Sequence, residues 1–118
     1  MSHEALLSGS HAYGTPHPDS DVDLVVYLSP DDARKLIDNA DSVVFHSPGY
    51  RSCRYGKLNL MVCIDDKHYE VWKDGIGELK LNAPVTREFA IALFEGMRAE
   101  ARIPELYRYH IGGDPEDI

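Results

Sequence analysis

The chain has 118 residues, which is enough for one domain with one hydrophobic core and too few for two. Its 20 acidic residues outnumber its 12 basic residues, and the resulting net charge of -8 disfavours broad contact with the backbone of duplex DNA. No apolar run reaches the length of about 18 residues that a membrane span requires, so we expect no contact with a membrane.

The two cysteines, Cys53 and Cys63, lie ten residues apart and form no close-spaced pair. This spacing indicates neither a disulfide framework nor a zinc site. A reducing compartment fits such a sequence, and no basic segment followed by an apolar stretch indicates a secretion signal. We therefore expect a soluble protein of the cytoplasm.

The first predicted element is a short strand over residues 4–7, which leads into a turn of small residues. Gly9 and Gly14 allow backbone conformations that other residues adopt only with strain, and Ser10 adds a hydroxyl where a helix or turn would begin. Several backbone N–H groups can converge on an anion in such a turn. Few residues precede this strand, which leaves one of its sides open to another part of the chain or to a second subunit of a homodimer.

The next strand begins with two carboxylates. Side chains in a strand alternate between its faces, so Asp21 and Asp23 are expected on one face and an apolar row, Val22, Leu24, Val26 and Leu28, on the other. Two carboxylates side by side repel each other unless a cation lies between them. Oxygen ligands of this kind favour Mg²⁺ or Mn²⁺ over zinc.

Two histidines, His11 and His17, flank the small-residue turn. Together with Asp19 they could form a metal site, contact a substrate, or lie in a solvated loop. Their spacing matches no recognised metal motif, and the sequence leaves the three alternatives open.

An anion-binding turn followed closely by a carboxylate pair predicts a site for a metal-bound polyphosphate. In these residues, Gly9-Ser10, Gly14 and Ser20-Asp21-Val22-Asp23-Leu24, the sequence resembles the DNA polymerase β superfamily of nucleotidyltransferases, and especially its small stand-alone members. The resemblance implies a mixed sheet with packed helices, and Asp21 and Asp23 as ligands of Mg²⁺ or Mn²⁺. It further implies nucleotide binding by Gly9, Ser10, Gly14 and Ser20.

The middle of the chain predicts a helix over residues 30–38, a strand over 42–46 and a turn over 47–50. Ser29 is expected to cap the helix and Pro30 to occupy its first position. A basic segment follows, and Arg51, Arg54 or Lys57 could contact the triphosphate or an acceptor. The alternative is a solvated hairpin tip.

A further strand is expected over residues 57–64. Its branched residues, Leu58, Leu60, Val62 and Ile64, would face the core, with Asn59 on the polar side. In the resemblance, Asn59 occupies the place of a third acid, which makes it the expected third residue of the catalytic site. If this strand is parallel to that of Asp21 and Asp23, Asp65 lies roughly 20 Å from them and caps the next helix; if antiparallel, Asp65 could replace the missing acid.

Two more helices are predicted, over residues 66–79 and 84–102, and Trp72 is expected in the core. Residues 105–118 contain a Gly-Gly-Asp-Pro turn and are expected as a short packed segment or a frayed tail. Taken together, the pattern and the resemblance predict a single α+β (α/β) domain over residues 1–118, with a mixed sheet of about four strands.

The leading functional hypothesis is transfer of a nucleoside monophosphate from a nucleoside triphosphate to a hydroxyl. The acceptor could be a protein or a small RNA, or it could be held by a partner chain. An alternative is a nucleotide-binding or partner-binding module in which Asn59 has weakened or abolished catalysis, because an amide cannot take up a proton from the acceptor. A third is an acidic protein that acts on another protein through surface charge alone.

Overall fold

The computed structural model describes residues 3–47 and 50–103. Its elements in chain order are β1 (Leu6–Ser8), α1 (Ser10–Tyr13), β2 (Val22–Tyr27), α2 (Pro30–Ile37), β3 (Ser42–Ser47), β4 (Tyr50–Tyr55), β5 (Leu58–Cys63), α3 (Asp66–Leu81) and α4 (Arg87–Ala101). The centre of the predicted turn over 47–50 and the segment 105–118 lie outside the described residues.

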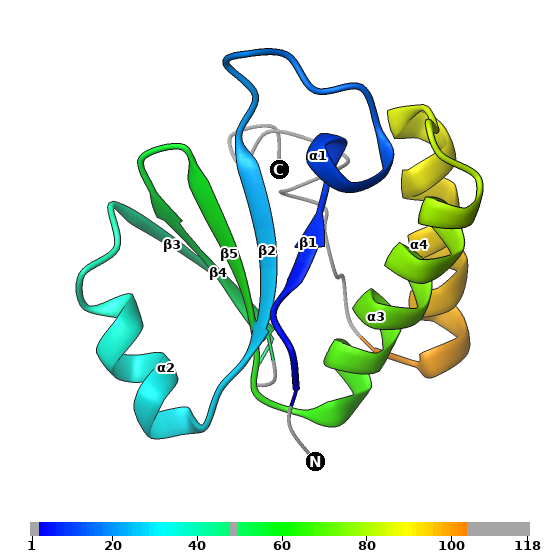
Figure 1. Cartoon of the computed structure of the whole chain (residues 1–118). Helices are drawn as coiled ribbons and strands as arrows, with labels where there is room; N and C mark the ends of the chain where they lie inside the picture. The colour runs from blue at the N-terminus through cyan, green and yellow to red at the C-terminus, as the bar shows by residue number, and fades with distance from the viewer. Residues whose placement is uncertain (1–2, 48–49, 104–118) are drawn as a thin grey trace.

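The five strands form one mixed sheet in the order β1-β2-β5-β4-β3 (Figure 1). The central strands β2 and β5 are parallel, and every other neighbouring pair is antiparallel. A parallel pair needs a crossover connection, and here α2, β3 and β4 lie between the two strands in the chain. The expected α+β fold with a mixed sheet is confirmed.

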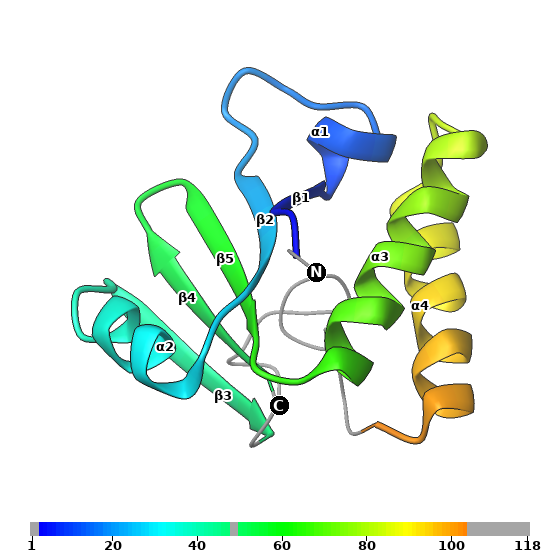
Figure 2. The ribbon, with the colours of Figure 1, turned by 60° about the horizontal axis from the view of Figure 1, so that its bottom comes forward.

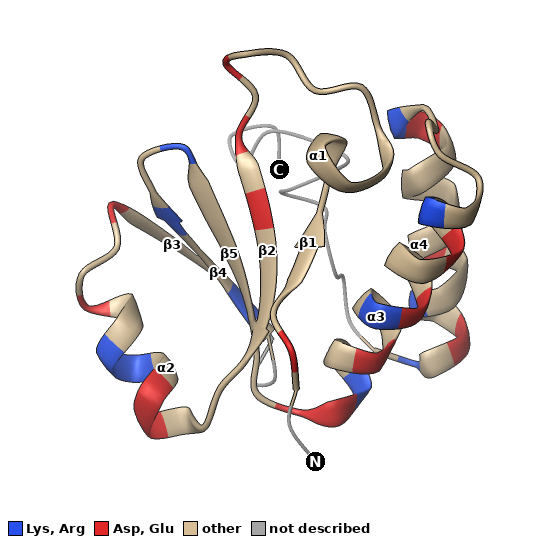
Figure 3. Cartoon of the chain, viewed as in Figure 1, with Lys and Arg blue, Asp and Glu red and all other residues tan. Residues whose placement is uncertain are grey.

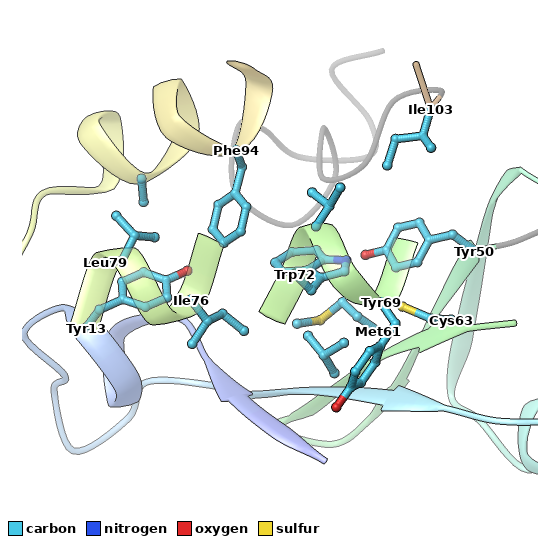
Figure 4. Packing of buried hydrophobic residues seen from close by; sticks show 13 residues of the cluster. Tyr13, Tyr50, Met61, Cys63, Tyr69, Trp72, Ile76, Leu79, Phe94 and Ile103 are labelled. Atoms are coloured by element: carbon cyan, nitrogen blue, oxygen red, sulfur yellow. The ribbon is translucent and has the colours of Figure 1, made fainter. Parts of the chain in front are cut away.

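Helices cover both faces of the sheet (Figure 2). Helices α3 and α4 lie on one side, where α3 packs on the strands and α4 packs on α3. The core between the sheet and these two helices is strongly aromatic. Trp72 of α3 lies between Phe94 of α4, at a ring distance of 4.8 Å, and Tyr50 of β4, at 6.2 Å (Figure 4). Trp72 is fully buried, as the sequence predicted.

Helix α2 covers the opposite face with a smaller apolar cluster. Ala33 packs there with Leu60, Val62 and Cys53. The Ser29 hydroxyl accepts a hydrogen bond from Asp32 N at 3.2 Å, and Pro30 is the first helical residue, so this helix begins as the sequence predicted.

The expectation that the branched residues mark the only core face of residues 57–64 was wrong. Met61 and Cys63, on the same face as Asn59, are buried in the larger core under α3. On β2, Val25 shares the face of Asp23 and is also fully buried. The reason is that a strand in the middle of a sheet with helices on both sides buries both faces, so only the end that carries Asp23 and Asn59 is polar.

Strand β4 was not predicted, because its residues were interpreted as a loop. Its buried positions are occupied by Tyr50, Ser52 and Cys53, and two arginines interrupt the apolar pattern. Hydrogen bonding to β3 on one side and to β5 on the other makes this segment a strand in spite of its polar composition. The sheet therefore has one strand more than expected.

The helix boundaries differ from the expected ones by a few residues. Helix α4 begins at Arg87 rather than at Pro84, because the Thr86 hydroxyl caps it by accepting a hydrogen bond from Phe89 N at 3.1 Å. Helix α3 continues to Leu81. Asp65 caps α3 through His68 N at 2.9 Å, as expected for parallel β2 and β5. Within the described ranges, no helix combines the length and apolar character needed to cross a bilayer.

Two glycines of α3 provide a test of this packing. A Cβ at Gly75 would lie 2.3 Å from Cε1 of Phe94, whereas a Cβ at Gly77 would meet nothing within 4 Å. We expect Gly75→Ala to lower the free energy of unfolding by about 1–3 kcal/mol through overpacking. Gly77→Ala should raise it by about 0.5–1 kcal/mol, because alanine loses less backbone entropy in a helix. Urea unfolding measures both, and equal effects would contradict the packing of α4 on α3.

Candidate functional site

The polar end of the sheet carries a row of residues from four neighbouring strands. Ser8 of β1 pairs with Asp23 of β2, Asp23 pairs with Asn59 of β5, and Asn59 pairs with Arg54 of β4. Directly paired residues share a face of the sheet, so these four side chains lie on the side of α3. Figure 3 shows acidic residues at the start of β2 and basic residues at the neighbouring end of β4 and β5.

The small-residue turn lies directly against Asp23. Gly9 has φ +67°, and a Cβ on Gly9 would lie 2.2 Å from Asp23 Oδ2. A side chain at position 9 would therefore collide with the carboxylate, and the backbone conformation also favours glycine. The small-residue turn and the acidic strand are thus in contact, because pairing of Ser8 with Asp23 places Gly9 beside it.

The short helix α1 follows the turn, and its first residues lie at the same end of the sheet as Asp23. Gly9 O accepts hydrogen bonds from Ala12 N at 3.0 Å and Tyr13 N at 3.2 Å. As at every helix start, the first N–H groups have no acceptor within the helix, so those near Ser10 suit an anion. Gly14 packs closely on Ser10, since a Cβ there would lie 3.0 Å from Ser10 Cα.

Tyr13 holds α1 to the body of the protein. Its hydroxyl lies 3.2 Å from the Ser8 hydroxyl, and its carbonyl accepts a hydrogen bond from Val85 N at 2.8 Å. Burial raises the pKa of Tyr13, so its hydroxyl stays protonated. Sequence reasoning missed both Ser8 and Tyr13, although the position of Ser8 immediately before Gly9 was an available signal.

Each carboxylate of the pair already has a partner. The Asn59 Nδ2 donates a hydrogen bond to Asp23 Oδ1 at 2.9 Å, and Arg54 Nη2 donates to Asp21 Oδ2, also at 2.9 Å. The amide orientation of Asn59 follows from this hydrogen bond, since a rotated amide would set two oxygens against each other.

Asp23 is half-buried, and its pKa is raised. Burial is the main cause, and the neighbouring charge of Asp21 raises it further. The hydrogen bond from Asn59 and the charges of Arg54 and His11 lower it, but they do not reverse the effect of burial. A carboxylate with these neighbours gains from a further cation.

The loop before β2 is organised by Ser20. Its hydroxyl accepts a hydrogen bond from His17 N at 2.7 Å, and its carbonyl lies 3.4 Å from His11 Nε2. The structure brings His11 close enough to influence the pKa of Asp23. His17 contributes its backbone to the loop. Among the described residues, no three His, Cys, Asp or Glu side chains form a group that could hold a metal ion.

The three cations of the basic segment have different positions. Arg54 lies in the polar row, whereas Lys57 Nζ contacts Asp19 at 3.2 Å in the neighbouring loop, where both side chains are exposed. Arg51 pairs with Val62 of β5 and therefore lies on the α2 face, three pairs along the sheet from Arg54. The structure does not bring Arg51 to the carboxylates, because its position in β4 directs it to the opposite face.

The donor set fits a divalent cation bound together with a ligand that supplies further oxygens. Two carboxylates and an amide are hard donors typical of Mg²⁺ sites, and Mg²⁺ is commonly held by one or two carboxylates plus phosphates. The clearance left by Gly9 puts Asp23 next to the anion-binding turn. A polyphosphate could therefore contact both the turn and the cation.

Most of the chain matches one protein-family model. Residues 2–82 match the model of the nucleotidyltransferase domain, which covers β1 through α3 and includes every residue of the polar row. The chain belongs to the nucleotidyltransferase domain family. No curated protein and no solved structure matches it.

The contact between the turn and Asp23 can be tested at Gly9, with Gly56 as a second glycine of positive φ. Gly9 and Gly56 have φ of +67° and +61°, but a Cβ at Gly56 would meet nothing within 4 Å. We expect Gly56→Ala to lose about 1–2 kcal/mol of stability through backbone strain. Gly9→Ala should lose more, because its φ of +67° with ψ of −160° is a conformation that essentially only glycine adopts and because it displaces Asp23. The contact itself is measured by repeating Gly9→Ala in an Asp23→Ala background, where it should cost about 1 kcal/mol less. Equal costs in the two backgrounds on urea unfolding would contradict the contact.

The raised pKa of Asp23 predicts a pH-dependent effect of removing its charge. The folded protein binds the Asp23 proton more tightly than the unfolded chain, so stability falls as the pH rises from the unfolded pKa through the folded pKa. We therefore expect Asp23→Asn to raise Tm at pH 7 by about 2–5 °C, with no gain near pH 3. Asp31→Asn, on exposed α2, is the control. A lower Tm at pH 7 for Asp23→Asn alone would contradict the prediction.

Proposed function

We propose that this chain transfers a nucleoside monophosphate from a nucleoside triphosphate to a hydroxyl group, with release of pyrophosphate. The family supports nucleotidyl transfer in general. The observation that carries the proposal is the contact of Gly9 with Asp23 Oδ2, because it joins an anion-binding turn to a carboxylate in one site.

In the proposed site, Asp21 and Asp23 hold Mg²⁺ or Mn²⁺. The backbone of Gly9 and Ser10 binds the β- and γ-phosphates, while Gly14 and Ser20 fix the shape of the turn and its loop. Lys57, at the same end of the sheet, adds positive charge toward the triphosphate. When bound, the divalent ion would supply neutralisation of phosphate charge, which is the main requirement of phosphoryl transfer.

The reaction forms a bond between the acceptor oxygen and the α-phosphorus, and breaks the bond from the α-phosphorus to the oxygen that leaves with pyrophosphate. The acceptor hydroxyl gives its proton to a water molecule. Asn59 can offer its carbonyl oxygen to the cation after its amide rotates, but it cannot take up this proton. The chain's own residues therefore bind and orient the triphosphate more effectively than they activate the acceptor.

A second candidate function follows from Asn59. Because its amide donates to Asp23 at 2.9 Å, it stabilises the ionised carboxylate without adding a charge for a second metal ion. A chain of this kind could bind a metal–nucleotide complex and present it to a partner without transferring the nucleoside monophosphate. Asn59→Asp distinguishes the two functions, since it restores a third acid.

The acceptor we propose is a protein or a small RNA rather than duplex DNA, because the net charge of -8 disfavours a long nucleic-acid backbone. A second copy of the chain or a partner chain could contribute to acceptor binding. The buried, free thiols of Cys53 and Cys63 agree with the reducing cytoplasm as the compartment.

The experiment incubates the purified protein with α-labelled nucleoside triphosphates, Mg²⁺ or Mn²⁺, and cell extract as the source of acceptor. We expect labelled product with the wild type and a loss of at least about 100-fold when Asp21 and Asp23 are both changed to alanine. Asn59→Asp should increase labelling about tenfold or more, because it supplies a base.

The matched control removes two exposed carboxylates from α2 by Asp31→Ala with Asp32→Ala, and it should label like the wild type. Equal labelling by the Asp21 and Asp23 double variant would contradict the proposed transfer. Metal-dependent nucleotide binding without labelled product, even for Asn59→Asp, would favour the binding module.

A further inference from the structure

Arg54 places a positive charge in direct contact with Asp21, one of the two proposed metal ligands. Its Nη2 donates to Asp21 Oδ2 at 2.9 Å and its Nη1 donates to Gly56 O at 3.1 Å. The carbonyl of Gly56 lies in the turn between β4 and β5, so the guanidinium is held between that turn and the start of β2. The side chains of Arg54 and Asp21 are 44% and 38% exposed, so the pair can separate without opening the core.

The strand register explains why Arg54 reaches Asp21 and its neighbours do not. Arg54 pairs with Asn59, which itself pairs with Asp23, so Arg54 lies two strands from the carboxylates on their own face. Arg51 lies on the other face, and Lys57 contacts Asp19. In this structure Arg54 therefore forms an ion pair with Asp21, one of the two carboxylates that a divalent cation would use.

We propose that Arg54 is a positioning residue that holds Asp21 when no cation is bound and makes cation binding depend on the polyphosphate. The inference rests on the proposed function, since it concerns the same carboxylates. It assigns to Arg54 a role in the order of binding rather than in the transfer step.

The physical reason is competition followed by exchange of partners. A divalent cation that arrives alone must separate Asp21 from Arg54 and then lies close to the displaced guanidinium, which repels it. A triphosphate that arrives with the cation offers the guanidinium a new anionic partner, and the planar fork of arginine matches phosphate oxygens well. Cation and nucleotide should therefore bind with positive coupling that depends on Arg54.

The experiment measures three affinities by titration calorimetry. They are the affinity for Mn²⁺ alone, the affinity for a non-hydrolysable nucleoside triphosphate analogue with divalent ions removed by a chelator, and the affinity for the analogue with Mn²⁺. Electron paramagnetic resonance of free Mn²⁺ is a second readout. No turnover is needed. The variants are Arg54→Gln, which removes the charge, and Arg54→Lys, which keeps it without the fork. Arg34→Gln, on exposed α2, is the control with the same change in net charge.

We expect Arg54→Gln to bind Mn²⁺ alone about two- to fivefold more tightly than the wild type, the range set by loss of one partly exposed ion pair. The same variant should bind the metal-free analogue about tenfold more weakly, because a charged phosphate contact is lost. Because Arg54 contacts the analogue with or without the cation, this loss cancels, and the coupling between Mn²⁺ and the analogue falls about two- to fivefold relative to the wild type. Affinity of the analogue for Mn²⁺ in solution is common to all variants and cancels from this comparison.

Arg54→Lys should bind Mn²⁺ alone like the wild type but the analogue more weakly, because it retains the charge and loses the fork. Unchanged or weaker Mn²⁺ binding by Arg54→Gln, with the wild type binding normally, would overturn the role of Arg54 and leave the proposed function intact. Wild-type protein that binds neither Mn²⁺ nor its complex with the analogue would overturn both. Far-ultraviolet circular dichroism checks that each variant is folded. If Arg54→Gln does not fold, the affinities of Arg54→Lys alone test the role of Arg54, and analogue binding as tight as in the wild type would overturn it.

Discussion

The structure depends on the close approach of Gly9 to the carboxylate of Asp23. This approach requires antiparallel pairing of β1 with β2, a positive φ at Gly9 and the absence of a Cβ there. The rest of the chain supports it: Tyr13 ties α1 to Ser8 and to the connection before α4, and the core under α3 fixes β2 and β5. Without this approach, the small-residue turn and the acidic pair would be two unrelated surface features.

The electrostatics of the site follow from where it lies in the sheet. Asp23 is at the end of a central strand, so the core below it raises its pKa while Asn59 and Arg54 partly compensate. The neutral amide of Asn59 and the guanidinium of Arg54 thus stabilise the two carboxylates in the folded protein. A carboxylate that is costly to ionise in the folded protein is also one that gains most from a bound cation, which is a common relation between stability and function.

Asn59 makes this site differ from one with three acids. Its pairing opposite Asp23 in parallel β2 and β5 places an amide between Asp23 and Arg54 across the sheet. An aspartate there would add a third negative charge beside Asp21 and Asp23, and the amide instead donates a hydrogen bond to Asp23. Membership of the nucleotidyltransferase domain family and an amide at this position are compatible, since an amide oxygen remains a ligand for hard cations.

The sequence by itself determined a chain of mixed helices and strands, the caps at Ser29 and Asp65, the burial of Trp72 and the existence of a turn and carboxylate motif, while the mixed sheet was implied by the family resemblance. These features depend on local spacing, on which residues favour caps and turns, and on strand alternation. It did not reveal β4, whose strand conformation comes from hydrogen bonds to β3 and β5 rather than from apolar alternation. It also misassigned the main core face of residues 57–64, because both faces of a central strand are buried.

Only the tertiary structure decided which side chains meet. The sequence offered Arg51, Arg54 and Lys57 as alternatives, and the register of β4 with β5 brought Arg54 to Asp21 and turned Arg51 to the opposite face. The distance from Gly9 to Asp23 likewise depends on pairing between strands. Local sequence fixes the direction of a side chain relative to its own strand, but contacts across a sheet depend on strand order and register, which the whole fold determines.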